Sequence, residues 1–133
     1  MLTAKEFSLR DKFGTYNGMD VVSVGKGTAV ARFEVKAHHK NGLGTVHGGA
    51  LFTLADLAFA AATNCGEEVI VSINSSMSFA KACTDGVLTA EAREVARSSR
   101  LVNYEAKVRN EAGDIVALFQ GIGYIKNRSA KQT

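Results

Sequence analysis

The sequence predicts a single α+β domain in which a curved antiparallel sheet wraps around one long central helix. Three observations lead to this prediction. The chain has 133 residues, the length of one ordinary domain, and 46% of them are hydrophobic, which provides for a core. Only one segment, from about His47 to Asn64, has the length and apolar spacing of a long helix. Segments rich in β-branched residues precede and follow it.

The residues before the long helix are expected to form a short amphipathic helix, in the first dozen positions, and then two short strands. The strands lie in residues 19–36, around Gly25 and Gly27. In the second strand small or apolar residues alternate with mostly polar ones, so that one face points to the core. A polar loop follows, in which we interpret the adjacent His38 and His39 as exposed.

The long helix is unusually apolar. Its leucines recur at spacings of three and four residues. Six alanines leave hardly any polar face: Ala50, Ala55, Ala58, Ala60, Ala61 and Ala62. We therefore expect this helix to be buried nearly all round, which requires a wrapping sheet or a partner subunit. Gly66 is expected to cap its C-terminal end.

Four segments after the helix are predicted to be consecutive antiparallel strands that form a meander. They cover residues 69–79, 87–97, 101–108 and 115–126, with turn sequences between them. In the first of these strands, strict alternation places four polar residues on one face and three apolar residues on the other. The polar set is Ser72, Asn74, Ser76 and Ser78, and the apolar set is Ile73, Met77 and Phe79.

Charge and composition argue against several classes of protein. Sixteen Lys and Arg against 13 Asp and Glu give a net charge of +3, but three of these cations lie in the last eight residues. We therefore expect one neutral domain in residues 1–125 and a polar, basic tail in residues 126–133. A neutral domain is not typical of a nucleic-acid binder. The longest apolar stretch, residues 50–62, is shorter than the ~20 residues that cross a bilayer, so no membrane span is expected.

The N-terminal residues carry charges every few positions and no apolar segment. We therefore expect no secretory signal peptide and a cytoplasmic protein. Cys65 and Cys83 are the two cysteines, and they lack the spacing of metal ligands. They are expected to be reduced thiols, and no metal site is expected.

Two glycines, Gly48 and Gly49, stand where the long helix begins. Glycine disfavours a helix by roughly 1 kcal/mol relative to alanine, so another requirement must explain them. The first N–H groups of a helix have no partners within it, and they can stabilise the negative charge that a carbonyl oxygen gains during attack. The glycines are therefore candidate oxyanion donors. The alternative is a tight turn from the loop into the helix.

Asp56 is a carboxylate in the middle of this apolar helix. Burial should raise the pKa of its side chain. A carboxylate in a dry cleft can attack a carbonyl directly or take a proton from water. The alternative is a buried aspartate that hydrogen-bonds a neighbouring strand.

Two polar residues precede the helix, and each has more than one interpretation. His47 can polarise a substrate, fix the loop or cap the helix. Asn41, which lies among glycines, is either a turn residue or a side chain that holds a water or a substrate oxygen.

This segment contains three motifs in order: Asn41, His47-Gly48-Gly49 and Leu54-Ala55-Asp56. Together they resemble the acyl-CoA thioesterases of the hotdog superfamily, specifically the phenylacetate-degradation PaaI-type group. The similarity covers nearly the whole chain. The resemblance implies the hotdog fold and hydrolysis of an acyl- or aryl-CoA thioester. It implies Asp56 as nucleophile or general base, with the backbone of Gly48 and Gly49 polarising the thioester carbonyl.

The resemblance also implies supporting roles and partners. Asn41 would help to place the water, and His47 would orient the loop. Ser72 would correspond to a serine or threonine at the start of the strand that follows the helix. Arg97 and Arg100 lie at the turn that meets CoA phosphates in this family, and they would make those contacts. No metal or resident cofactor is implied, because CoA arrives as part of the substrate. Such proteins are homodimers that usually pair into homotetramers.

Helix geometry adds an expectation of its own. Gly49 and Asp56 are seven residues apart, which is roughly 10 Å along the helix axis. One thioester carbonyl cannot meet both, so we expect sites shared between two antiparallel helices of a two-fold dimer. Two alternatives to a thioesterase remain open: a non-catalytic acyl-CoA binding module, and a hotdog dehydratase acting on hydroxyacyl thioesters.

Overall fold

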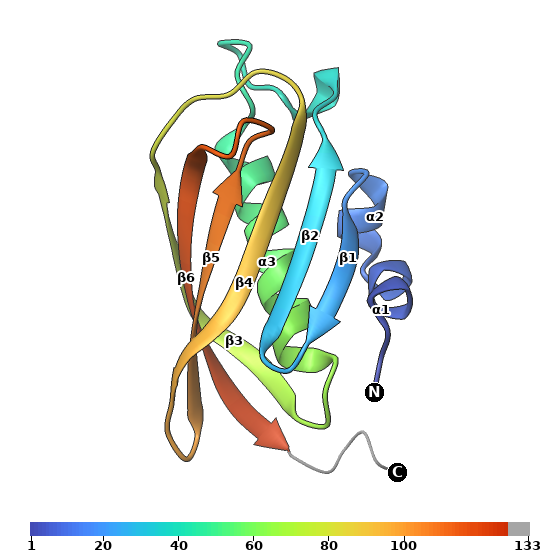
Figure 1. Cartoon of the computed structure of the whole chain (residues 1–133), viewed down its shortest axis with the longest axis vertical. Coiled ribbons are helices and arrows are strands. Elements are labelled where there is room, and N and C mark those ends of the chain that lie inside the picture. The colour runs from blue at the N-terminus through green and yellow to red at the C-terminus, as the bar shows by residue number, and fades with distance from the viewer. Residues whose placement is uncertain (128–133) are drawn as a thin grey trace.

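The computed structural model describes residues 1–127, which form one six-stranded sheet curved around a central helix, α3 (Figure 1). In chain order the elements are α1 (Ala4–Arg10), α2 (Lys12–Tyr16), β1 (Asp20–Gly25), β2 (Thr28–Glu34), the short 3-10 helix η1 (Ala37–His39), α3 (Gly48–Asn64), β3 (Val69–Phe79), β4 (Val87–Arg97), β5 (Leu101–Arg109) and β6 (Ile115–Asn127). The predicted α+β class and its central helix are confirmed. No helix in residues 1–127 is long and apolar enough to span a membrane.

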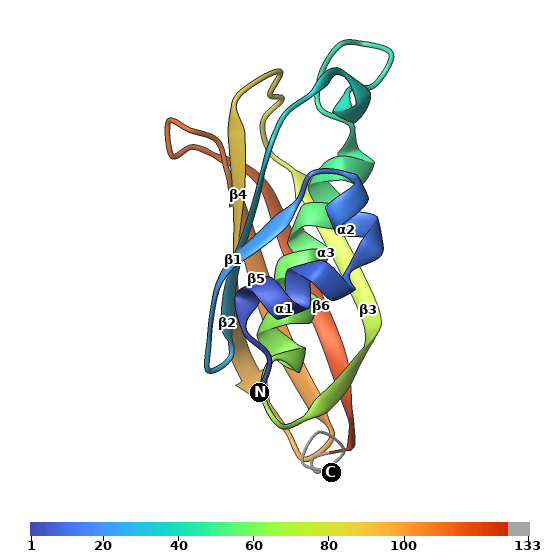
Figure 2. The ribbon, with the colours of Figure 1, turned by 90° about the vertical axis from the view of Figure 1, so that its right-hand side faces the viewer.

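The strand order is β1-β2-β4-β5-β6-β3, with every neighbouring pair antiparallel. The prediction of a four-strand meander was therefore wrong for β3, because β3 pairs with β6 and only β4, β5 and β6 form a meander. Local periodicity identifies strands but not their neighbours. With β3 beside β6, the two edges of the sheet lie on opposite sides of α3, which lets the sheet wrap the helix (Figures 1 and 2).

The core lies between α3 and the concave face of the sheet. Leu54, Ala55 and Ala58 of α3 are fully buried there. The predicted alternation in β2 is confirmed, since Ala29, Ala31 and Phe33 point inward, and alanines recur on the inner face of β4. Small side chains let the sheet approach the helix closely.

The N-terminal residues cover a further side of α3. They form two short helices where one was predicted, because Asp11 ends α1 and caps α2 by accepting a hydrogen bond from Gly14 N–H at 2.8 Å. Ser8 ties α1 to β1, since its Oγ lies 2.6 Å from Val21 N and 3.3 Å from Val21 O. Figure 2 shows both helices beside α3, along the β1 edge of the sheet.

Even so, the single chain does not bury α3 nearly all round, and the prediction left the remaining burial to a partner subunit. The stripe of residues 49, 52, 53, 56 and 60 keeps partial exposure, because neither the sheet nor α1 and α2 cover it. Two boundaries also differ from the prediction. Cys65, in a right-handed conformation, is the C-cap of α3, so Gly66 only follows the cap. Lys126 and Asn127 lie within β6, and residues 128–133 of the predicted tail are outside the described residues.

Candidate active site

Asn41 organises the loop that leads into α3. Its Oδ1 accepts hydrogen bonds from Leu43 N–H at 2.9 Å and from Thr45 N–H at 3.2 Å, and its amide nitrogen contacts the Thr45 hydroxyl. A single bridge between Lys40 and Val46 closes the loop. Of the two interpretations of Asn41, the structure therefore supports the turn residue, because both ends of its amide are engaged within the loop.

His39 is buried, with only 3% of its surface exposed, so the prediction that both adjacent histidines are exposed was wrong. The 3-10 helix η1 turns the ring inward, where its Nδ1 accepts from Lys36 N–H at 2.9 Å and its Nε2 lies 2.7 Å from Asn17 O. Burial lowers the pKa of His39. The His39 carbonyl in turn accepts from His47 N–H at 2.8 Å, so this histidine supports the start of α3.

His47 is the N-cap of α3. Its Nδ1 accepts a hydrogen bond from Gly49 N–H at 2.8 Å, and its carbonyl accepts from the next two amides of the first turn, those of Ala50 and Leu51. Capping is thus the role that the structure supports among the three considered. Gly49 N–H is already occupied, which leaves Gly48 N–H as the first-turn amide without a hydrogen bond in residues 1–127.

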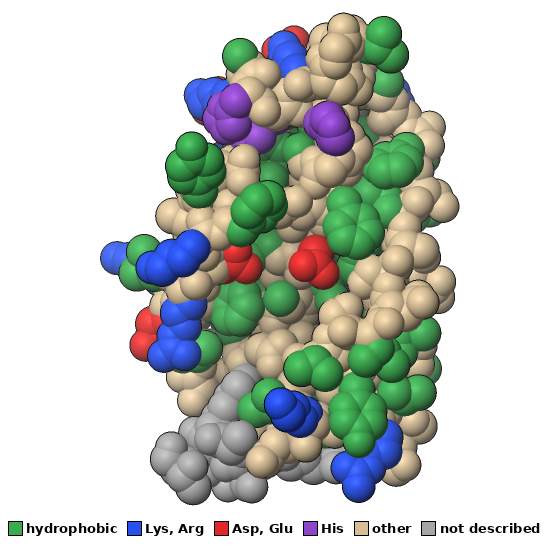
Figure 3. All heavy atoms as spheres, turned by 180° about the vertical axis from the view of Figure 1, so that it is seen from behind, with side chains coloured by type: hydrophobic (Ala, Val, Ile, Leu, Met, Phe, Trp, Pro, Cys, Tyr) green, Lys and Arg blue, Asp and Glu red, His purple; other side chains and the backbone are tan. Residues whose placement is uncertain are grey.

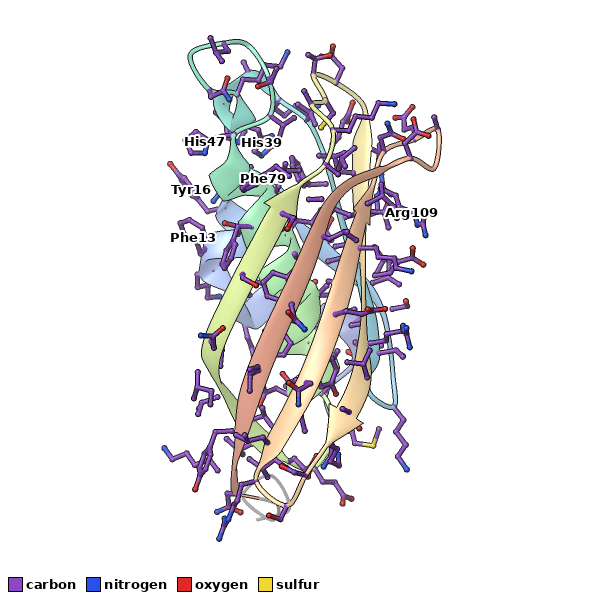
Figure 4. The ribbon with its side chains drawn as sticks, turned by 90° about the vertical axis from the view of Figure 1, so that its left-hand side faces the viewer. Phe13, Tyr16, His39, His47, Phe79 and Arg109 are labelled. Atoms are coloured by element: carbon purple, nitrogen blue, oxygen red, sulfur yellow. The ribbon has the colours of Figure 1, made fainter. Side chains whose placement is uncertain are left out.

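Gly48 faces a pocket of about 370 Å³ at the start of α3. The pocket is lined by Asn41, Val46, Leu51, Phe79, Lys81 and Cys83, among others. The ring of Phe79 lies against Gly48, because a Cβ added at Gly48 would sit 3.0 Å from Phe79 Cζ. Figure 4 shows Phe79 and His47 together at this end of α3. Gly48 therefore allows a close approach, both by Phe79 and by any ligand in the pocket.

Asp56 lies on the uncovered stripe of α3, half-buried, and its carboxylate makes no hydrogen bond within residues 1–127. The alternative of an aspartate bonded to a strand is therefore wrong. Burial raises the pKa of Asp56, and the nearby carboxylate of Asp11 raises it further. Figure 3 shows a face of the molecule on which acidic side chains have hydrophobic neighbours.

Ser72 lies before a β-bulge in β3, between Ser72 and Asn74. Because the bulge adds a residue, it resets the alternation. Ser72 and Ser75 pair with the inward positions Gly123 and Gly121, and their hydroxyls are 3.3 Å apart. The predicted face shared by Ser72 and Asn74 was therefore wrong, since Asn74 now points away from the helix.

Arg97 and Arg100 lie at the other end of the molecule from Gly48. Arg97 is bound by two carboxylates, those of Glu68 at 2.9 Å and Glu94 at 2.8 Å, beside a cavity of about 1020 Å³ at the C-terminal end of α3. These ion pairs raise the pKa of Arg97. Arg100 is exposed in the turn between β4 and β5.

One chain therefore brings Asn41, His47 and Gly48 together, but not the whole predicted set. Asp56 is eight residues further along α3 than Gly48, roughly 12 Å along the axis. Within residues 1–127 no group of three or more His, Cys, Asp or Glu side chains could hold a metal ion.

Comparison with known proteins identifies the family. Residues 43–117 match the model of the Thioesterase superfamily. The chain belongs to this superfamily. It is 35% identical over 105 residues to the acyl-coenzyme A thioesterase PaaI of Escherichia coli strain K12. This match covers 78% of this chain and 75% of that protein. The chain is therefore a thioester hydrolase, as predicted.

Solved structures agree with the hotdog fold predicted from the sequence. A mutant of the phenylacetic acid degradation protein PaaI from Thermus thermophilus superposes with a TM-score of 0.82 at 37% identity, covering 86% of this chain and 99% of that one. A thioesterase-fold protein from Streptococcus pneumoniae TIGR4, solved with coenzyme A, has a TM-score of 0.84 at 23% identity, covering 95% of this chain and 98% of that one.

Proposed function

We propose that this thioesterase hydrolyses an acyl- or aryl-coenzyme A thioester, with Asp56 as nucleophile or general base and Gly48 N–H as oxyanion donor. The observation that carries the proposal is the carboxylate of Asp56, which is half-buried and without a hydrogen bond on the uncovered stripe of α3. Such a group is costly unless a reaction uses it. The relative named acyl-coenzyme A thioesterase supports CoA as the carrier.

Both forms of the mechanism use the ionised carboxylate of Asp56. As general base it takes a proton from water, the hydroxide attacks the thioester carbon, and the C–S bond breaks as the proton passes to the departing thiolate. As nucleophile it attacks the same carbon, forms an anhydride and releases the thiolate, and water then cleaves the anhydride. In either form Gly48 N–H stabilises the negative oxygen.

We further propose that each site is shared between two chains of a homodimer. The strand β3 supports this, because it is an edge strand of 11 residues with no charge and no proline to protect it. It also exposes Val71, Ile73 and Phe79. Two-fold pairing of β3 edges would set two α3 helices antiparallel and bring Asp56 of one chain near Gly48 of the other. Pairing of dimers into tetramers remains part of the proposal.

The remaining residues take supporting roles in this proposal. Asn41 and His47 hold the loop and the first turn, which keeps Gly48 at the wall of the pocket. Ser72, with Ser75, is a candidate contact for water or substrate on the inner face of β3. Arg100 is a better candidate than Arg97 for CoA phosphates, because the donors of Arg97 already bind two carboxylates. We propose no resident cofactor.

The first prediction tests the role of Asp56 directly. Asp56→Asn should keep the fold and lower kcat at least ~100-fold, because an amide neither attacks a carbonyl nor accepts a proton. The measurement is release of free thiol from a panel of acyl- and aryl-CoA thioesters, with thermal melts as the control for folding. A folded variant with more than about a tenth of the activity would remove Asp56 from catalysis.

The same panel separates the two alternatives. A binding module would bind CoA thioesters without releasing thiol from any of them. A dehydratase would convert a hydroxyacyl thioester into an enoyl thioester, which is seen by absorbance, again without free thiol.

A further inference from the structure

Helix α2 begins directly against the middle of α3, where Asp56 lies. Asp11 is the N-cap of α2, and its Oδ1 is held by Gly14 N–H at 2.8 Å. Gly14 is buried, and a Cβ added there would lie 3.1 Å from this same Oδ1 and 3.3 Å from Cδ2 of Leu57, the residue after Asp56. The carboxylate of Asp11 is thus fixed beside the segment of α3 that carries Asp56.

Among residues 1–127, no Lys or Arg offsets the effect of Asp11 on the pKa of Asp56. Asp56 is the only ionisable residue of α3, and β3 has no charged residue. Asp11 is the one charged group whose field acts appreciably on Asp56 among residues 1–127. The other charges of α1 and α2 are either hydrogen-bonded within these helices or exposed: Lys12 bonds Leu9 O, Glu6 bonds Thr3, and Lys5 and Arg10 are exposed.

The surface agrees with this description. In Figure 3 acidic side chains in the middle of the face have hydrophobic neighbours, and Lys and Arg side chains lie at the left margin and near the lower end. Burial and the negative charge of Asp11 both disfavour the ionised form of Asp56, which raises its pKa. A cap alone does not require this arrangement, because asparagine or serine would cap α2 as well as aspartate does.

We propose that Asp11 is a positioning residue of the thioesterase, whose fixed negative charge makes Asp56 a stronger base toward the attacking water. This inference rests on the proposed function of Asp56 and assigns no contact between Asp11 and substrate. In the general-base reaction, the proton that leaves water moves to Asp56, where the charge of Asp11 stabilises it. The proton then passes to the CoA thiolate when the C–S bond breaks.

The test removes the charge and keeps the cap. Asp11→Asn and Asp11→Ser both retain an N-cap for α2, so the fold should survive. The pH dependence of kcat should have an acidic limb, since the proposed mechanism uses the ionised carboxylate of Asp56. In both variants this limb should move to lower pH by about half a unit, and kcat above the limb should fall about twofold to fivefold, because Asp56 becomes a weaker base.

A second measurement follows Asp56 without turnover. The carboxyl carbon of Asp56, observed by 13C NMR in labelled protein, should titrate at a lower pH in Asp11→Asn than in the wild type. Asp20→Asn is the matched control, because it removes the same charge from an exposed position at the start of β1. It should move neither the NMR titration nor the limb.

The outcomes are distinct. If the NMR titration and the acidic limb both move in the Asp11 variants and stay in place in Asp20→Asn, the inference is supported. If either stays in place in the Asp11 variants, or if Asp20→Asn moves them equally, the inference is overturned. Failure of the proposed function would instead appear as activity retained in Asp56→Asn, a different variant with a different readout.

Discussion

At the scale of single residues, one backbone group distinguishes the start of α3. Three of its first four N–H groups donate hydrogen bonds to His47: one to its ring and two to its carbonyl. The amide of Gly48 is left without a hydrogen bond within residues 1–127, and Gly48 lines the pocket beside Phe79. The contact with Phe79 also favours glycine, so the residue type alone does not separate packing from catalysis.

A pair of substitutions separates them. Gly48→Pro removes the N–H, and proline is well tolerated at the first position of a helix. His47 already has φ −62° and ψ 136°, the conformation that a residue before proline prefers. Gly48→Ala keeps the N–H and adds the same Cβ against Phe79. We expect kcat of Gly48→Pro to be about 100-fold below that of Gly48→Ala, the effect of losing one oxyanion donor.

Equal activity losses in the two variants would contradict this role for the amide. The glycine would then serve only for space beside Phe79. Thermal melts of both variants control for folding, since the added Cβ crowds the same ring in each case.

The sequence predicted those site residues that are anomalous for their element. Glycines opening a helix and an aspartate within an apolar one are unfavourable locally, so another requirement is needed to explain them. It did not predict that His47 would occupy Gly49 N–H, because hydrogen-bond partners depend on rotamers and not on spacing. Nor did it indicate Asp11, whose position beside Asp56 arises only when α2 packs on α3.

At the scale of elements, η1 supports the loop that carries the candidate site. Its buried His39 is hydrogen-bonded as a neutral ring, with Nδ1 as acceptor and Nε2 directed at a carbonyl. A proton added at Nδ1 would face Lys36 N–H, a second donor. The backbone of the same residue holds His47 N–H, so the ring fixes the start of α3.

The lowered pKa of His39 predicts how stability changes with pH. The unfolded chain takes up a proton near pH ~6.5, while the folded chain does so only at lower pH. This contribution to the free energy of unfolding is therefore present above pH ~6.5 and lost as the pH falls toward the folded-state pKa. Urea titrations between pH 8 and 5 should show a steeper loss of stability in the wild type than in His39→Gln.

His38→Gln is the matched control, since it changes the exposed neighbour in the same 3-10 helix. It should keep most of the wild-type slope, because burial is the largest cause of the lowered pKa of His39 and the charge of His38 is a smaller one. If His39→Gln lost stability with falling pH as steeply as the wild type, the pH dependence would come from other groups.

Strands were predicted far better than their arrangement. Each of the four later segments is a strand within about two residues of its predicted bounds, because β-branched content and turn residues act locally. The position of β3 beside β6 and the bulge after Ser72 were missed. Both depend on contacts between residues far apart in the chain, which alternation along one strand does not contain.

At the scale of the whole molecule, two incomplete surfaces lie next to each other. The stripe of α3 that carries Asp56 is not covered, and the edge of β3 has unpaired backbone groups with apolar side chains beside them. A second copy that pairs along β3 would cover both at once. The N-terminal helices leave this side open and lie at the β1 edge instead (Figures 1 and 2).

The shared site predicts that two inactive variants restore each other. In a dimer of Asp56→Asn with Gly48→Pro, one of the two sites has both intact groups and the other has neither. Equal amounts refolded together give half heterodimers, so about a quarter of wild-type activity should return, although each variant alone is inactive. Native mass spectrometry counts the mixed dimers, and unmixed variants refolded separately provide the baseline. Mixed dimers without recovered activity would overturn the shared site. One carbonyl cannot bridge the roughly 12 Å between Gly48 and Asp56 of the same chain, so at least one of these two residues would then lose its proposed role.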